Sequence, residues 1–153
     1  MPYEPYFTEE HDQLRKTIRR FVEKEIAPFV DEWEEQGEFP RSVFSRMGEL
    51  GFLGLHYPES VGGQGGDYFS GLVFAEELNK CGCGGLPMAI AVQTDMATPP
   101  IFKFGTKDQH ERFLKPAIRG EKIAAIGITE PNNGSDVMGI FVTEMKGSFQ
   151  NIL

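Results

Sequence analysis

The sequence lacks several features that would assign it to a class of protein at once. It has only two cysteines, Cys81 and Cys83, among 153 residues, and such a pair cannot build the disulfide framework of a small secreted domain. No apolar run approaches the ~20 residues that span a bilayer. Basic residues are a minority, with 15 Lys and Arg against 23 Asp and Glu and a net charge of −8. This balance argues against a nucleic-acid-binding protein, because such proteins cluster Lys and Arg along the phosphates.

Metal-ligand clusters and targeting segments are missing as well. The histidines His11, His56 and His110 lie far in sequence from the two cysteines, so the chain shows no zinc-ligand spacing and we predict no metal site. We interpret the cysteines as structural or incidental, with a redox or metal role as the alternative. The first residues contain no basic region, apolar signal core or Arg/Ser-rich transit pattern. We therefore expect a cytoplasmic protein, or a mitochondrial matrix protein if the chain is a mature eukaryotic form.

The chain does contain enough apolar residues for a core. Hydrophobic residues make up 40% of the sequence and charged residues 25%. For this length, folding would bury roughly 69% of the surface that the unfolded chain exposes. The length suits one domain, or one domain and the start of another.

Apolar residues spaced three and four apart predict a mainly α-helical fold. A stripe from Leu14 to Trp33 predicts one long amphipathic helix that begins after the capping residue Thr8 and is kinked at Pro28. Further helices are predicted over residues 40–51, 68–80, 87–104 and 106–120. We expect Pro99 and Pro100 to divide the segment 87–104 into two pieces.

The glycine-rich stretch 58–67 predicts a loop that connects two of these helices. A phosphate-binding loop is the alternative, but neither a Walker lysine nor the dinucleotide spacing follows. The pattern changes at about residue 121, where the apolar run 123–128 has the length of a β-strand. We therefore predict two parts, an N-terminal helical domain over residues 1–120 and the start of a β-domain over residues 121–153.

The turn that follows this predicted strand has the composition of a ligand site. Thr129 would lie at the end of the strand, and Asn132, Asn133 and Gly134 tolerate the left-handed conformation that turns N–H groups into one concavity. Ser135 adds a hydroxyl. Such a turn could hold an anionic or heteroaromatic ligand. The same residue types also suit an ordinary capped turn, in which Asp136 only satisfies nearby backbone groups.

Residues 127–139 resemble the first signature of the flavin-dependent acyl-CoA dehydrogenases. The residues that match its specified positions are Gly127, Ile128, Thr129, Glu130, Asn133, Gly134, Ser135, Asp136 and Gly139. Segments that begin at residues 7, 47, 57 and 104 also look like the N-terminal domain of this family. The resemblance therefore extends from residue 7 to about residue 140.

The resemblance implies an architecture, a cofactor and a reaction. Family members have an N-terminal α-helical domain, a middle β-domain and a C-terminal four-helix domain, with FAD between the last two. A glutamate removes the α-proton of an acyl-CoA thioester while the β-hydride passes to the flavin, and electrons then pass to an electron-transfer flavoprotein. The expected fold is the N-terminal orthogonal helical domain followed by the truncated start of the β-domain, and the expected full-length form is a homo-oligomer.

The resemblance also implies which residues form the site. The flavin-contact candidates are Ile126, Gly127, Ile128, Thr129, Glu130, Pro131, Asn132, Asn133, Gly134 and Ser135. By this match, the backbone of residues 128–130 and the Thr129 hydroxyl would hydrogen-bond the isoalloxazine edge. Ser135 would lie between the FAD phosphates and the CoA portion of the substrate, so it is also the substrate-binding candidate. Met88, Val92 and Met96 form a stripe where the family builds part of its acyl pocket; we interpret such a stripe as core, with contact to an acyl chain as the alternative.

The sequence departs from the family after Gly139. Relatives continue with an Arg-Thr-containing strand, whereas residues 140–153 do not match it, and no residue matches the catalytic glutamate. Neither Glu130 nor Glu144 is assigned that role. Three interpretations remain: the N-terminal part of an acyl-CoA dehydrogenase that is inactive alone, a non-catalytic helical module that docks on a partner chain, and a truncated product with no activity of its own.

Overall fold

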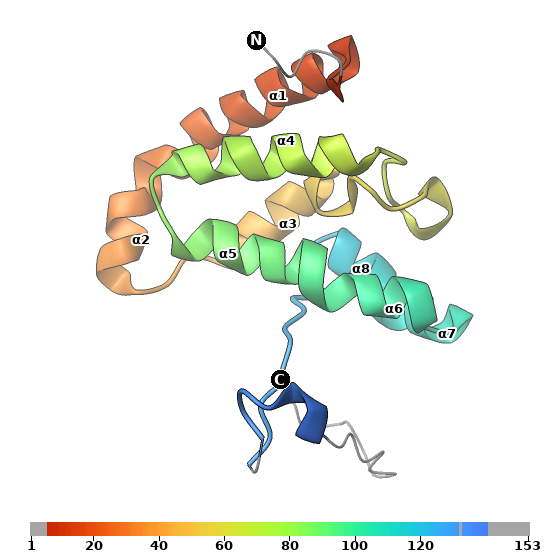
Figure 1. Cartoon of the computed structure of the whole chain (residues 1–153). Helices are drawn as coiled ribbons and strands as arrows, with labels where there is room; N and C mark the ends of the chain where they lie inside the picture. The colour runs from red at the N-terminus through yellow and green to blue at the C-terminus, as the bar shows by residue number, and fades with distance from the viewer. Residues whose placement is uncertain (1–5, 132, 141–153) are drawn as a thin grey trace.

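The computed structural model describes residues 6–131 and 133–140, and most of this part of the chain is helical (Figure 1). This confirms the predicted mainly α fold. The α-helices are α1 (Glu9–Phe21), α2 (Val30–Gln36), α3 (Ser42–Glu49), α4 (Tyr68–Leu78), α5 (Gly85–Ala91), α6 (Thr98–Phe104), α7 (Lys107–Gln109) and α8 (Lys115–Ile118). Tighter 3₁₀ turns and wider π-helical turns join several of them, and the two π-helical turns used below are η2 (Val22–Ile26) and η7 (Val92–Ala97).

The helices form two levels around the core. Helix α1 packs along α4, and α5 and α6 run below them with α3 and α8 behind (Figure 1). The predicted kink in the first long helix is confirmed. The chain passes from α1 through η2 and a 3₁₀ turn at Ala27–Phe29 into α2, because Pro28 cannot donate the backbone hydrogen bond of a helix interior.

The predicted break at Pro99 and Pro100 is wrong. The chain stays helical from α5 through η7 into α6, and the two prolines are the second and third residues of α6, within a first helical turn, where proline is tolerated. The change of register is taken up by η7 instead. The Gln93 carbonyl accepts from both the backbone N–H and the hydroxyl of Thr98, the hydroxyl at 2.5 Å.

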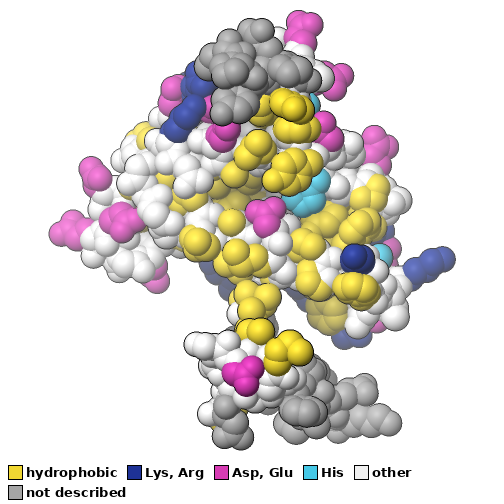
Figure 2. Space-filling model, viewed as in Figure 1, with side chains coloured by type: hydrophobic (Ala, Val, Ile, Leu, Met, Phe, Trp, Pro, Cys, Tyr) yellow, Lys and Arg dark blue, Asp and Glu magenta, His cyan; other side chains and the backbone are white. Residues whose placement is uncertain are grey.

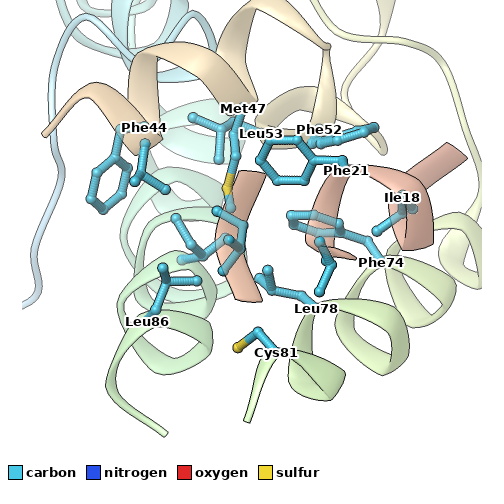
Figure 3. Close-up of a cluster of buried hydrophobic side chains, with 14 of the residues drawn as sticks. Ile18, Phe21, Phe44, Met47, Phe52, Leu53, Phe74, Leu78, Cys81 and Leu86 are labelled. Carbon is cyan, nitrogen blue, oxygen red and sulfur yellow. The ribbon is translucent and has the colours of Figure 1, made fainter. Parts of the chain in front are cut away.

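The main core lies between α1, α3, α4 and α5 (Figure 3). Its fully buried side chains include Ile18 from α1, Met47 from α3, Val73 from α4 and Leu86 from α5. Cys81 is a free thiol at the edge of this cluster, as the structural interpretation of the cysteines expects. Apolar burial of this kind is the main source of stability in such a domain.

One carboxylate is buried where α1 packs on α4. Glu77 is fully buried and accepts hydrogen bonds from Arg15 at 2.9 Å, Arg19 at 2.9 Å and Lys80 at 2.7 Å. These bonds, above all the one from Arg19, lower the pKa of Glu77 to about 2. The ion cluster therefore ties α1 to α4 through a group that is charged at neutral pH.

The end of α8 is packed against α3 backbone to backbone. Gly120 has a φ of +71°, and a Cβ placed on it would lie 2.0 Å from the Phe44 carbonyl oxygen. A Cβ on Gly48 would lie 2.1 Å from the Arg119 carbonyl oxygen. Two glycines thus allow α3 to contact the turn from which the chain leaves the helical domain.

The strand predicted over residues 123–128 is wrong for this chain. Residues 123–129 have no regular secondary structure, and a single bridge between Glu130 and Asn133 is the only β pairing found in the described residues. A strand needs a neighbour for its backbone groups, and no strand in the described residues supplies one. The segment leaves the helices, and residues 130, 131 and 133–140 lie apart from them (Figure 1).

Candidate functional site

The candidate flavin-contact residues form an exposed segment and turn. Ile126 and Ile128 are 45% and 52% exposed, while Gly127, Thr129, Pro131, Gly134 and Ser135 are also exposed and Glu130 and Asn133 are half-buried. Asn132 lies outside the described residues, as does Glu144. The structure therefore places the predicted residues together along one stretch of chain without burying them against the helical domain.

The turn is closed by its own backbone and by two side chains. The Glu130 N–H donates to the Asn133 carbonyl at 2.9 Å, and the Asn133 N–H donates back to the Glu130 carbonyl at 3.1 Å. The Asn133 side-chain amide donates to the Gly139 carbonyl. Asp136 accepts a bond from the Met138 N–H at 3.2 Å. Asp136 therefore does satisfy a nearby backbone group, as the capped-turn alternative expects.

The segment before this turn offers open hydrogen-bond donors. Within the described residues, no backbone hydrogen bond uses the N–H groups of residues 126–129. No atom lies within 4 Å of the place where a Cβ would stand on Gly127 or Gly134. Main-chain N–H groups and the hydroxyls of Thr129 and Ser135 are donors that an isoalloxazine edge and a phosphate accept. The residues present fit a flavin nucleotide in their chemistry.

Sequence reasoning missed the residue that attaches this segment to the helices. Gln93 in η7 is 1% exposed, and its side-chain amide contacts three backbone groups at the end of the helical domain. The Ala124 N–H donates to Gln93 Oε1 at 2.8 Å, and Gln93 Nε2 donates to the carbonyls of Ala117 at 2.9 Å and Lys122 at 3.2 Å. The available signal was a glutamine within the apolar run 87–104.

The stripe formed by Met88, Val92 and Met96 faces outward. Met88 is 58% exposed, Met96 is 42% exposed and Val92 is half-buried, so the interpretation of this stripe as core is wrong. Hydrophobic side chains are gathered over α4 and over α5 and α6 on the face shown in Figure 2. Contiguous exposed apolar surface marks a site of contact with another molecule or domain.

A surface hollow of about 490 Å³ lies elsewhere, between α1 and the loop before α4. His11 is buried there and contacts Asp67 at 2.9 Å, while its Nδ1 accepts a bond from the Thr8 N–H. Asp67 also accepts from the Ser70 N–H at the start of α4, and the bond to His11 lowers the pKa of Asp67. These contacts tie the beginnings of α1 and α4 together, so His11 and Asp67 have a structural role in this hollow.

The described residues contain no group of three His, Cys, Asp or Glu side chains that could hold a metal ion. A search of the same residues finds no helix with the length and apolarity needed to cross a bilayer.

Comparisons with known proteins all point to one family. The family model described as the N-terminal domain of acyl-CoA dehydrogenases matches residues 8–121. A probable acyl-CoA dehydrogenase, YngJ of Bacillus subtilis, is 41% identical over 133 residues, which cover 86% of this chain and 34% of that protein. The CarC subunit of the caffeyl-CoA reductase–Etf complex of Acetobacterium woodii is 39% identical and is matched over 90% of this chain and 36% of the subunit.

Solved structures agree with the sequence matches. The crystal structure of a Bacillus anthracis acyl-CoA dehydrogenase complexed with FAD superposes with a TM-score of 0.80 at 35% identity, over 89% of this chain and 23% of that one. The chain thus spans about a third of the length of the curated relatives it matches.

Proposed function

Since this chain belongs to the acyl-CoA dehydrogenase family, we propose that it is the N-terminal part of a flavin-dependent acyl-CoA dehydrogenase and contributes to the FAD and acyl-CoA sites for α,β-dehydrogenation. The observation that carries the proposal is the match of residues 127–139 to the family signature on a segment whose backbone donors at residues 126–129 are open. We assign no catalytic residue to this chain, because none matches the glutamate base.

The proposed role of the segment is to bind and tune the flavin. The backbone of residues 128–130 and the Thr129 hydroxyl would hydrogen-bond the isoalloxazine edge, with the N–H groups of residues 128 and 129 as donors, and Ser135 would donate to the FAD phosphates and contact the CoA portion of the substrate. When bound, FAD supplies the hydride acceptor. Donors at its edge stabilise the negative charge of the reduced ring, which favours reduction.

The proposed acyl contact is the outward stripe of Met88, Val92 and Met96. Its exposure leaves it free to cover an acyl chain, and methionine side chains adapt to apolar ligands of varied shape. As partners we propose an electron-transfer flavoprotein, which the name of the Acetobacterium woodii relative supports, and further copies of the full-length form. A cytoplasmic location is proposed from the sequence alone.

The same exposed face supports a second candidate, a non-catalytic module that docks on a partner chain. The two candidates differ in whether this chain can complete a flavin site. A truncated product with no activity would complete neither a flavin site nor a complex.

We expect the 153-residue chain alone to retain no FAD, and a chimera to retain it. In the chimera, residues 8–139 of this chain replace the matching segment of the Bacillus subtilis relative. The isolated segment 123–140 makes few contacts that could hold a large cofactor, whereas the chimera restores the rest of the site. The measurement is the visible absorbance of the purified proteins and its bleaching by acyl-CoA thioesters of increasing length. A colourless, folded chimera would refute the proposed function, and a yellow isolated chain would refute the claim that it is inactive alone.

Within that chimera, Thr129→Val should weaken FAD binding by roughly tenfold, because one side-chain hydrogen bond to the flavin is lost while the volume is kept. The flavin should also become harder to reduce, since a donor to the reduced ring is missing. Thr17→Val is the matched control, because Thr17 is exposed on α1 and donates only to the Gln13 carbonyl. Equal FAD affinities in the two variants, from titration followed by fluorescence, would remove Thr129 from the site.

A further inference from the structure

We propose that Gln93 is a positioning residue that holds the flavin-site segment in register with the helix that faces the acyl chain, a role that rests on the proposed function. The structure joins these two features through one buried side chain in η7. The segment 117–124 approaches that side chain from the end of α8, and it continues directly into the candidate residues at Ile126.

Both ends of the Gln93 amide are used. Oε1 accepts from the Ala124 N–H at 2.8 Å, and Nε2 donates to the Ala117 and Lys122 carbonyls at 2.9 and 3.2 Å. Glutamine supplies the acceptor and the donors that this arrangement needs. At 1% exposure, no bulk water can replace a lost partner, so each bond contributes more than it would at the surface.

The backbone of Gln93 is held as firmly as its side chain. The Thr98 hydroxyl donates to the Gln93 carbonyl at 2.5 Å, and the Tyr57 hydroxyl lies 2.8 Å from Thr98 Oγ1. Tyr57 and Thr98 are both buried. Because both the backbone and the side-chain amide of Gln93 are hydrogen-bonded, the position of η7 determines the position of the segment that Gln93 binds.

The same π-helical turn presents a residue of the acyl-facing stripe. Met96 belongs to η7 and is 42% exposed, whereas Gln93 points into the protein. Ala124 lies two residues before Ile126, the first flavin-contact candidate. The anchor is therefore at the base of the flavin-site segment, where a displacement moves every residue that follows. Gln93 links the positions of the acyl chain and the flavin by geometry, without contacting either.

Hydrogen exchange of the Ala124 amide in the 153-residue chain tests the anchor directly. In Gln93→Met, which keeps the length but removes every hydrogen bond, we expect this amide to exchange about tenfold faster than in the wild type. Thr94→Val is the matched control, because Thr94 is buried in the same turn but donates to the Ile90 carbonyl and to Asp95 rather than to the segment. We expect its Ala124 exchange to stay within about twofold of the wild type.

An unprotected Ala124 amide in the wild type, or equal rates in Gln93→Met and the wild type, would overturn the inference. If Gln93→Met loses its helical circular dichroism, Gln93→Glu is measured instead. The carboxylate keeps an acceptor for Ala124 but has no donor for the two carbonyls, so we expect partial protection, and full wild-type protection would count against the anchor.

The chimera separates this inference from the proposed function. We expect Gln93→Met in the chimera to bind FAD roughly tenfold more weakly, and Thr94→Val to bind it like the parent chimera. If the parent chimera holds no FAD, the proposed function fails, whatever Ala124 exchange shows. If the parent binds FAD and Gln93→Met binds it equally well, the proposed function stands and the positioning role of Gln93 is refuted.

Discussion

Gly120→Ala is expected to lower the free energy of unfolding by about 3 to 4 kcal/mol. Two costs add at this position. A φ of +71° is unfavourable for alanine, and the new Cβ would lie 2.0 Å from the Phe44 carbonyl oxygen and 2.8 Å from the Ser45 Cα. Both neighbours are backbone atoms of α3, so neither can move away by a side-chain rotation.

Gly37→Ala is the matched control for this prediction. Gly37 has nearly the same backbone conformation, with a φ of +74°, but no atom lies within 4 Å of its added Cβ. Only the conformational cost of about 1 kcal/mol then applies. Urea unfolding followed by circular dichroism measures both variants. Equal losses in the two would show that the close contact between α3 and the turn after α8 does not exist in solution.

Glu77→Gln is expected to cost about 3 kcal/mol at neutral pH, because it removes the buried charge that Arg15, Arg19 and Lys80 share. This loss is at the lower end of the range for breaking a buried ion pair. The reason is that the side chains of Arg19 and Lys80 are about half exposed, so water can hydrate their charges when the Glu77 carboxylate is removed. Glu76→Gln is the matched control. Glu76 pairs with Arg15 at 2.7 Å but is 45% exposed, so its removal should cost under about 1 kcal/mol.

The pH dependence of the same variant gives an independent check. The folded-state pKa of Glu77, about 2, lies below its ordinary value of 4.5. A carboxylate with a lowered pKa stabilises the fold above the unfolded value, and this contribution is lost as the pH falls from about 4.5 towards 2. The difference in stability between the wild type and Glu77→Gln should therefore shrink across this window. A difference that stays constant from pH 7 to pH 2.5 would contradict the assigned charge.

The Gly120 prediction bears on the proposed site because Gly120 lies at the end of the helical domain. Gly120 and Gly48 bring α3 against the turn after α8, and Gln93 then binds the chain at Ala117, Lys122 and Ala124. The backbone is therefore held by contacts from Ala117 to Ala124, where the chain leaves the helices. Because the flavin-site segment begins at Ile126, these contacts fix where that segment starts.

Periodicity in the sequence was sufficient for the helices. The apolar stripe from Leu14 to Trp33 and the kink at Pro28 depend on residues within one or two turns of each other, and the structure has both of them. The resemblance of residues 127–139 likewise needed only local sequence. Local rules apply because backbone hydrogen bonds in a helix, and the residues that begin or end it, are near neighbours in the chain.

Three features were decided by tertiary structure alone. The run 123–128 has the composition of a strand, but strand pairing depends on a distant partner that its own residues do not specify. The stripe of Met88, Val92 and Met96 favours a core position by its composition, and only the placement of the neighbouring helices shows that it faces outward. Gln93 and Glu77 are of residue types that usually lie at the surface, yet both are buried. The hydrogen-bond partners of Gln93 lie 24 to 31 residues away in the sequence, and the arginine partners of Glu77 lie 58 to 62 residues away.

The sequence by itself determined the helices and the family signature, since both are local. Burial and long-range hydrogen bonding, which are properties of the whole packed chain, required the tertiary structure.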